Sequence, residues 1–214
     1  MGSKAWFIAY FDDQPKTILS ASPKPEREAS RQLAERLFPE ATLRDEGDNS
    51  LSFLCPDKRQ VLVGSYDGLR IVAHEELAND HPSKISPRWF NPEFGSTAYL
   101  HATHGGVDWF AFGLWRNGEP IRTLSVSPDD MILEQTGDPL DFELPYWKGR
   151  HPVAADPGEE PYPLPFHPLE LAEASLLHHL GFQLEGSMDD WVCNPDDIGI
   201  CHYADTKRPF WKFW

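Results

Sequence analysis

The chain has no hydrophobic run long enough to cross a bilayer. A transmembrane helix needs about 20 consecutive, predominantly apolar residues, and no stretch of the 214 residues approaches that length. The first residues, MGSKAWFIAYFDD, also lack the charged start, the uninterrupted apolar stretch and the cleavage site of a secretory signal. We therefore expect a soluble, cytoplasmic protein with no membrane partner.

Cysteine is scarce, and the common catalytic and nucleotide-binding motifs are missing. The three cysteines, Cys55, Cys193 and Cys201, form no CxxC motif, which argues against a disulfide framework and a zinc ribbon. The chain contains no GxGxxG or GxxxxGKS loop for phosphates and no GxSxG turn for a serine nucleophile. We accordingly expect no metal site and no cofactor.

Basic residues are nearly absent from one third of the chain. The formal net charge is −15, and residues 129–205, whose only basic residues are Lys148 and Arg150, carry a net charge of the same size. An acidic surface disfavours nucleic acid and favours a basic partner. Two interpretations stay open, because the charge either keeps the protein in solution or binds a basic protein. The candidate partner-binding residues are Asp189, Asp190, Asp196 and Asp197.

What is present is an ordinary globular composition, with 40% hydrophobic and 25% charged residues. The length suits a single domain over residues 1–214. Apolar residues at helical spacing predict helices over residues 24–38 and 168–180, each with a proline near its start. Residues 4–11 predict a central strand covered on both faces, and residues 17–21 a short further strand.

Turn signals indicate how the remaining strands pair. Asp67-Gly68 predicts a tight hairpin within residues 61–74, and residues 97–135 predict a meander with a second such turn at Asn117-Gly118. Residues 75–96 are expected to form a long loop. The fold class is thus α+β, with a largely antiparallel sheet built from hairpins and a meander and two main helices packed on it.

Two segments have no regular pattern. Residues 137–166 are rich in proline yet carry many large apolar side chains, so we expect an extended segment that lies on the sheet and helps to cover it. Residues 206–214 form a basic, aromatic tail, TKRPFWKFW. This tail either packs back on its own domain, which we favour because an exposed apolar patch invites aggregation, or docks on a partner or a membrane interface.

The stretch LHATHGGVDWFAFGLW, residues 100–115, is the strongest candidate for a catalytic or metal-binding site. A two-residue turn at Gly105-Gly106 would place His101 opposite Phe110 and Thr103 opposite Asp108. His101 and His104 would then point to opposite faces, which argues against a shared metal ion.

Continuing this count through the second turn gathers an imidazole, a carboxylate and two hydroxyls at one end of one sheet face. The candidate catalytic residues are His101, Asp108, Ser125 and Ser127, and they lie above a candidate aromatic ligand platform of Tyr99, Phe110 and Phe112. In a hydrolase, the histidine would act as general base, the aspartate would orient it, and a serine would be the nucleophile. The alternative, which we favour, is a hydrogen-bonded cluster without catalytic function.

Several blocks of the sequence together resemble a known family. The blocks KAWFIAYFDD, YLHATHGGVDWFAFGLWRNG, SVSPDD with GDPLDFELPYW, and YPLPFHPLELAEASLLHHLGF make the chain similar to an uncharacterised family of actinobacterial proteins over roughly residues 4–185. The resemblance implies a bacterial, cytoplasmic protein and supplies no catalytic residues. The preferred hypothesis is an acidic binding protein, such as an inhibitor or immunity-type factor for a basic protein. The alternative is a hydrolase or small-ligand-binding protein that uses the His101 cluster.

Overall fold

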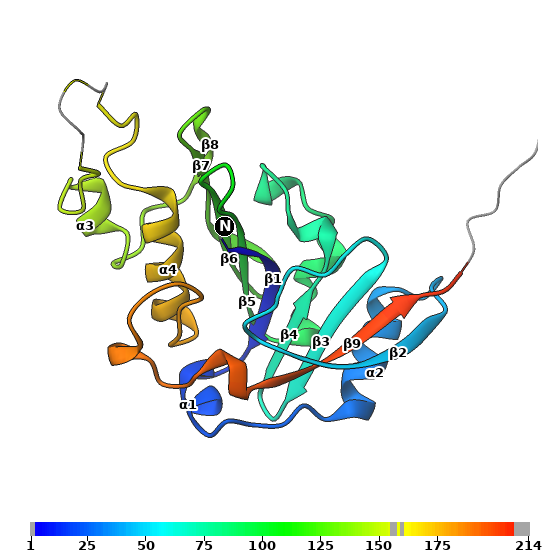
Figure 1. Ribbon diagram of the computed structural model, residues 1–214. Coiled ribbons are helices and arrows are strands. Elements are labelled where there is room, and N and C mark those ends of the chain that lie inside the picture. The colour runs from blue at the N-terminus through cyan, green and yellow to red at the C-terminus, as the bar shows by residue number, and fades with distance from the viewer. Residues whose placement is uncertain (1–2, 155–157, 159–160, 208–214) are drawn as a thin grey trace, which may run out of the picture.

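Nine strands form one open antiparallel sheet in the computed structural model, which describes residues 3–154, 158 and 161–207. The strands lie in the order β2-β9-β3-β4-β1-β5-β6-β7-β8 (Figure 1). Their bounds are β1 Lys4–Phe11, β2 Leu43–Ser50, β3 Gln60–Tyr66, β4 Leu69–Ala73, β5 Thr97–His104, β6 Trp109–Arg116, β7 Glu119–Ser127, β8 Met131–Thr136 and β9 Gly199–Asp205. The predicted α+β class with an antiparallel sheet is confirmed.

Two main helices accompany the sheet, together with two short ones. The α-helices are α1 Pro15–Ser20, α2 Arg27–Leu37, α3 Leu144–Trp147 and α4 Pro168–His179. The short 3-10 turns are η1 Glu75–Leu77, η2 Pro82–Lys84, η3 Pro87–Phe90, η4 Pro92–Phe94, η5 Met188–Asp190 and η6 Pro195–Asp197. Both helices predicted from apolar spacing are present, as α2 and α4. Within the described residues, no helix is long and apolar enough to span a bilayer.

Each face of the sheet buries its own hydrophobic cluster. On one face, side chains such as Phe7 and Phe112 pack against α1, α4 and the proline-rich segment. On the other face, side chains such as Ile8 and Leu100 pack against α2 and the turns η1 to η4. Figure 1 shows α3 and α4 on one side of the sheet and α2 on the other. Strand β1 lies between β4 and β5 and alternates between the two clusters, as its double apolar pattern predicts.

Three local assignments from the sequence were wrong or missing. Residues 17–21 were expected to be a strand, but they belong largely to α1, which begins with Pro15 in its first turn. A short apolar run does not distinguish a helix from a strand by its spacing. The sequence pattern does not predict strand β2, because it is an edge strand with charged side chains, and such charges protect the edges of natural sheets. Its neighbour β9 was likewise not assigned.

The turn between β5 and β6 is longer than the sequence predicted. His104 pairs with Trp109, so four residues, and not only Gly105 and Gly106, form the connection. His101 therefore lies opposite Phe112, and the predicted pairing with Phe110 was wrong by two positions. A shift of two residues keeps every side chain on its predicted face. The turns at Asp67-Gly68 and Asn117-Gly118 do join adjacent strands as predicted.

A β-bulge between β6 and β7 changes the predicted structure more than the longer β5–β6 turn does. Leu114 pairs with Arg122 and Trp115 pairs with Pro120, which leaves Ile121 as one extra residue on β7. A one-residue shift moves all following side chains to the opposite face of the sheet. Ser125 therefore lies opposite Ala111, and the predicted pairing with Phe110 was wrong.

Candidate functional site

His101 lies in the sealed interior of the protein. Its side chain is 0% exposed, and the ring stacks on Phe7. Its Nδ1 is 3.0 Å from the Tyr99 hydroxyl, which also lies 2.8 Å from Ser175 Oγ of α4. Burial lowers the pKa of His101 to about 3, so the imidazole is neutral at physiological pH. This arrangement is a hydrogen-bonded core cluster.

Asp108 is not a neighbour of His101 in this structure. It occupies the turn after β5 with a positive φ of 48°, and its carboxylate lies 3.5 Å from Nε2 of His167. His167 in turn caps α4, since its Nδ1 accepts a hydrogen bond from the Leu169 N–H at 3.3 Å. The carboxylate expected to orient one imidazole therefore lies beside a different one.

The two serines lie on the face of the sheet opposite His101. The bulge at Ile121 turns Ser125 toward Trp109, whose indole Nε1 donates to the hydroxyl at 3.1 Å. Ser127 Oγ accepts from the Asp130 N–H at 3.0 Å within a turn. The structure thus does not bring His101, Asp108 and the serines together, and the predicted geometry of that cluster was wrong.

The aromatic residues predicted as a ligand platform are core residues. Tyr99, Phe110 and Phe112 are each 0% exposed, and all three belong to the cluster covered by α4. A ligand would reach them only if the covering segments moved away. These three residues are aromatic because both faces of the sheet are packed against other segments.

The acidic candidates lie on the surface in one loop. Asp189 and Asp190 belong to η5, Asp196 and Asp197 belong to η6, and all four are exposed. The first turn is capped by Ser187, whose Oγ accepts from the Asp189 N–H at 3.4 Å. The second is capped by an asparagine side chain in the same way. The loop therefore has defined local structure.

A half-buried carboxylate holds the start of this loop against α4. Glu173 accepts hydrogen bonds from the N–H groups of Leu184 at 2.8 Å and Glu185 at 3.2 Å. Burial raises the pKa of Glu173 to about 7, and the two backbone donors partly offset this effect. A hydrogen bond at 3.2 Å from the Trp191 indole to Gln183 fixes the loop at a second point.

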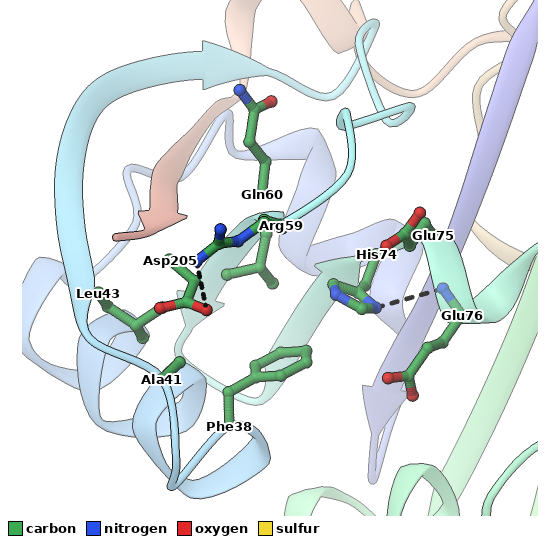
Figure 2. Close-up of a pocket in the computed structure, with 10 residues that line it drawn as sticks. Phe38, Ala41, Leu43, Arg59, Gln60, His74, Glu75, Glu76 and Asp205 are labelled. Carbon is green, nitrogen blue, oxygen red and sulfur yellow. Dashed lines mark hydrogen bonds and ion pairs between the residues drawn. The ribbon is translucent and has the colours of Figure 1, made fainter. Parts of the chain in front are cut away.

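A pocket of about 220 Å³ lies on the α2 side of the molecule. The end of α2, the chain leading into β2, the turn before β3, the end of β4 and the end of β9 meet there (Figure 2). Apolar side chains, among them Phe38, Leu43 and Val61, line part of it, and Arg59 and His74 supply polar groups. An apolar lining with a few placed polar groups is typical of small-molecule sites.

His74 is the most constrained polar residue of this pocket. It is only 8% exposed, and its ring centroid lies 4.6 Å from that of Phe38 and 5.8 Å from that of Trp89. Its Nδ1 accepts from the Glu76 N–H at 3.2 Å. Burial lowers the pKa of His74 to about 4, so the ring is neutral and its proton resides on Nε2. Figure 2 shows that second nitrogen directed toward the pocket.

Arg59 forms the opposite wall with an unusual backbone conformation. Its φ is 67°, a left-handed value that few residues other than glycine adopt. The Asp205 N–H donates to the Arg59 carbonyl at 2.8 Å, and the guanidinium Nη2 lies 3.3 Å from the Asp205 carboxylate. Strained residues of this kind are enriched in functional sites.

Sequence reasoning missed this pocket. His74 was placed at the end of a predicted hairpin and Arg59 in no element at all. No motif joins the two, because the residues come from separate parts of the chain. The only local signal would have been a histidine directly before an acidic pair, His74-Glu75-Glu76, which alone indicates no particular function.

Comparisons with known proteins place the chain in a family without assigning it an activity. In the described part of the chain, no group of three or more His, Cys, Asp or Glu residues is arranged to hold a metal ion. No curated protein and no solved structure matches the sequence significantly. A family model described as a family of unknown function (DUF6928) matches residues 5–203, and the chain therefore belongs to this family.

Proposed function

We propose that this protein is a non-catalytic binding protein whose acidic loop, residues 185–197, recognises a basic protein. The observation that carries the proposal is the exposure of unpaired carboxylates in this loop. Asp189, Asp190, Asp196 and Asp197 are exposed, and none of them forms an ion pair with a cation of the described residues. Unpaired surface charges of one sign accelerate encounter with an oppositely charged partner.

Exposed apolar side chains in the same loop support this proposal. Met188 is 61% exposed and Val192 is 38% exposed, and acidic residues flank them along the chain. Protein interfaces commonly combine an apolar centre, in which methionine is enriched, with a polar rim. A surface that served solubility alone would not need these apolar groups beside the charges.

In this proposal the protein works in the bacterial cytoplasm as an inhibitor or immunity-type factor for its basic partner. Capture from a lysate of the source organism at low and at moderate salt, followed by mass identification, would name the partner. The association rate with that purified partner is then measured for the wild type and for a variant with four substitutions, Asp189→Asn, Asp190→Asn, Asp196→Asn and Asp197→Asn.

We expect the variant to associate about tenfold more slowly at low salt, with the difference shrinking as salt screens the charges. A control with two substitutions, Asp138→Asn and Asp141→Asn, removes half as many exposed carboxylates outside the loop and should have much less than half the effect on the rate. Equal rates for the wild type and the loop variant would overturn the proposal. No observation favours the hydrolase alternative, because its candidate residues lie apart.

A further inference from the structure

We propose that the pocket between His74 and Arg59 binds a small, neutral, planar heterocycle that accepts hydrogen bonds. This inference is independent of the acidic loop, which lies elsewhere on the molecule. Three features support it: a histidine N–H that opens into the pocket, carboxylates that already accept hydrogen bonds from the protein, and an aromatic wall.

The pocket offers donors that have no partner among the described residues. His74 Nε2–H is directed into the pocket (Figure 2) and makes no hydrogen bond to the described residues. A donor at the wall of a largely apolar pocket can orient a ligand by binding one of its acceptors. The Arg59 guanidinium uses only Nη2 for its contacts with Asp205 and with the Lys207 carbonyl, so its other nitrogens remain able to donate.

Two of the neighbouring acceptors are already occupied by the protein. The Asp205 carboxylate accepts from the N–H groups of Thr42 at 3.0 Å and Lys207 at 2.8 Å, and from Arg59. Glu76 accepts from Arg88 at 2.6 Å and from the Trp89 indole at 3.1 Å. The pocket therefore has free donors but few free acceptors, and a ligand that fits it brings acceptors toward His74 and Arg59.

The charges favour a neutral ligand over an anion. Arg59 and Arg88 each face a carboxylate, on Asp205 and Glu76, so the two pairs are balanced. Glu75 also lines the pocket and forms no ion pair with a described cation. An added anion would be repelled by this uncompensated carboxylate, whereas a ring N–H group would find an acceptor in it.

The apolar wall favours a planar ring. Phe38 faces the pocket in Figure 2 and is held edge-on against Trp89, with ring centroids 5.8 Å apart. Ala41, Leu43 and Val61 complete the apolar lining. A flat aromatic ring stacks on phenylalanine with little loss of conformational freedom, and a volume of about 220 Å³ suits a molecule with one or two rings.

The test measures binding of three defined probes to the full chain by calorimetry and ligand-observed NMR. Nicotinamide and uracil represent the proposed class, and benzoate is an anion with a ring of the same size as that of nicotinamide. We expect saturable binding of at least one neutral probe, and benzoate binding about tenfold weaker or more.

Two variants connect binding to the pocket. Arg59→Asn removes the guanidinium but keeps a residue that tolerates a positive φ. His74→Asn keeps a side-chain acceptor for the Glu76 N–H but removes Nε2–H. Each should weaken binding about tenfold, the effect of one lost hydrogen bond in a partly desolvated site.

The matched control is Arg44→Asn, which removes an arginine that also makes one surface ion pair but does not line the pocket. Thermal unfolding verifies that each variant folds. Three results would overturn the proposal: no saturable binding of either neutral probe up to its solubility, benzoate binding as tightly as the neutral probes, or unchanged binding in folded Arg59→Asn and His74→Asn proteins.

Discussion

The ion pair between Arg122 and Glu143 should be among the most sensitive points for stability. Both side chains are 0% exposed, and they form a two-pronged contact with N–O distances of 3.0 and 2.6 Å. Glu143 also accepts from the Leu140 N–H and from the Trp147 indole. The pair therefore ties the proline-rich segment to strand β7.

Glu143→Gln keeps the size of the side chain but removes its charge. Arginine does not lose its proton in proteins, so Arg122 would remain as a buried cation without a counter-charge. Breaking a buried pair in this way costs about 3–5 kcal/mol, a large share of a typical unfolding free energy of about 5–15 kcal/mol. The carbonyls of Thr136 and Gly137, which accept from Arg122 at 3.1 and 3.0 Å, would offset part of the loss.

Urea unfolding of the two proteins measures this difference. The matched control is Glu35→Gln, which removes one partner of an exposed pair with Arg31 at 2.9 Å and should cost less than about 1 kcal/mol. A second variant, Arg122→Met combined with Glu143→Leu, replaces both charges by apolar groups and should recover part of the loss. If Glu143→Gln cost no more than Glu35→Gln, the reasoning from burial would be refuted.

Two further predictions concern other buried polar groups. Because the pKa of Glu173 is about 7 in the folded protein and its ordinary value is 4.5, the native state keeps a proton that the unfolded chain releases. Stability should therefore fall as pH rises from about 4.5 to about 7, by up to about 3 kcal/mol, and Glu173→Gln should remove this contribution. Urea unfolding at several pH values checks this, and identical profiles for the two proteins would contradict it. Ser125→Ala leaves the buried indole N–H of Trp109 without its acceptor and should cost about 1–3 kcal/mol in the same assay. A negligible cost would contradict this contact and would instead agree with the pairing expected without the bulge.

The sequence alone determined the elements that depend on local spacing. The apolar stripes of α2 and α4 repeat at helical intervals, and Asp67-Gly68 and Asn117-Gly118 carry the chemistry of tight turns. Strand β1 was recognisable because it is apolar on both faces. These features were sufficient for the α+β class and for the order of the central hairpins, since each is encoded within a few neighbouring residues.

The face on which a residue lies could not be counted reliably from the turns. One extra residue, Ile121, reversed the side on which Ser125 and Ser127 lie. Pro120, which lies at the bulge, is a local signal, because proline within a sheet occurs at edges, strand starts or bulges. Those alternatives do not by themselves locate the extra residue, which depends on cross-strand packing. The candidate cluster around His101 depended on that count, and so its geometry failed.

The sequence gives the number of carboxylates, whereas the fold decides which of them are exposed. The sequence determined that residues 129–205 are strongly acidic, and exposed Asp189 and Asp196 agree with that picture. Glu143, from the same acidic stretch, is instead buried against Arg122, and Glu173 is half-buried beside the loop. Only the tertiary structure decided which carboxylates meet water, because burial depends on segments far apart in the chain. The pocket of His74 and Arg59 arises for the same reason: its walls come from separate segments that the folded sheet and its covering helix bring together.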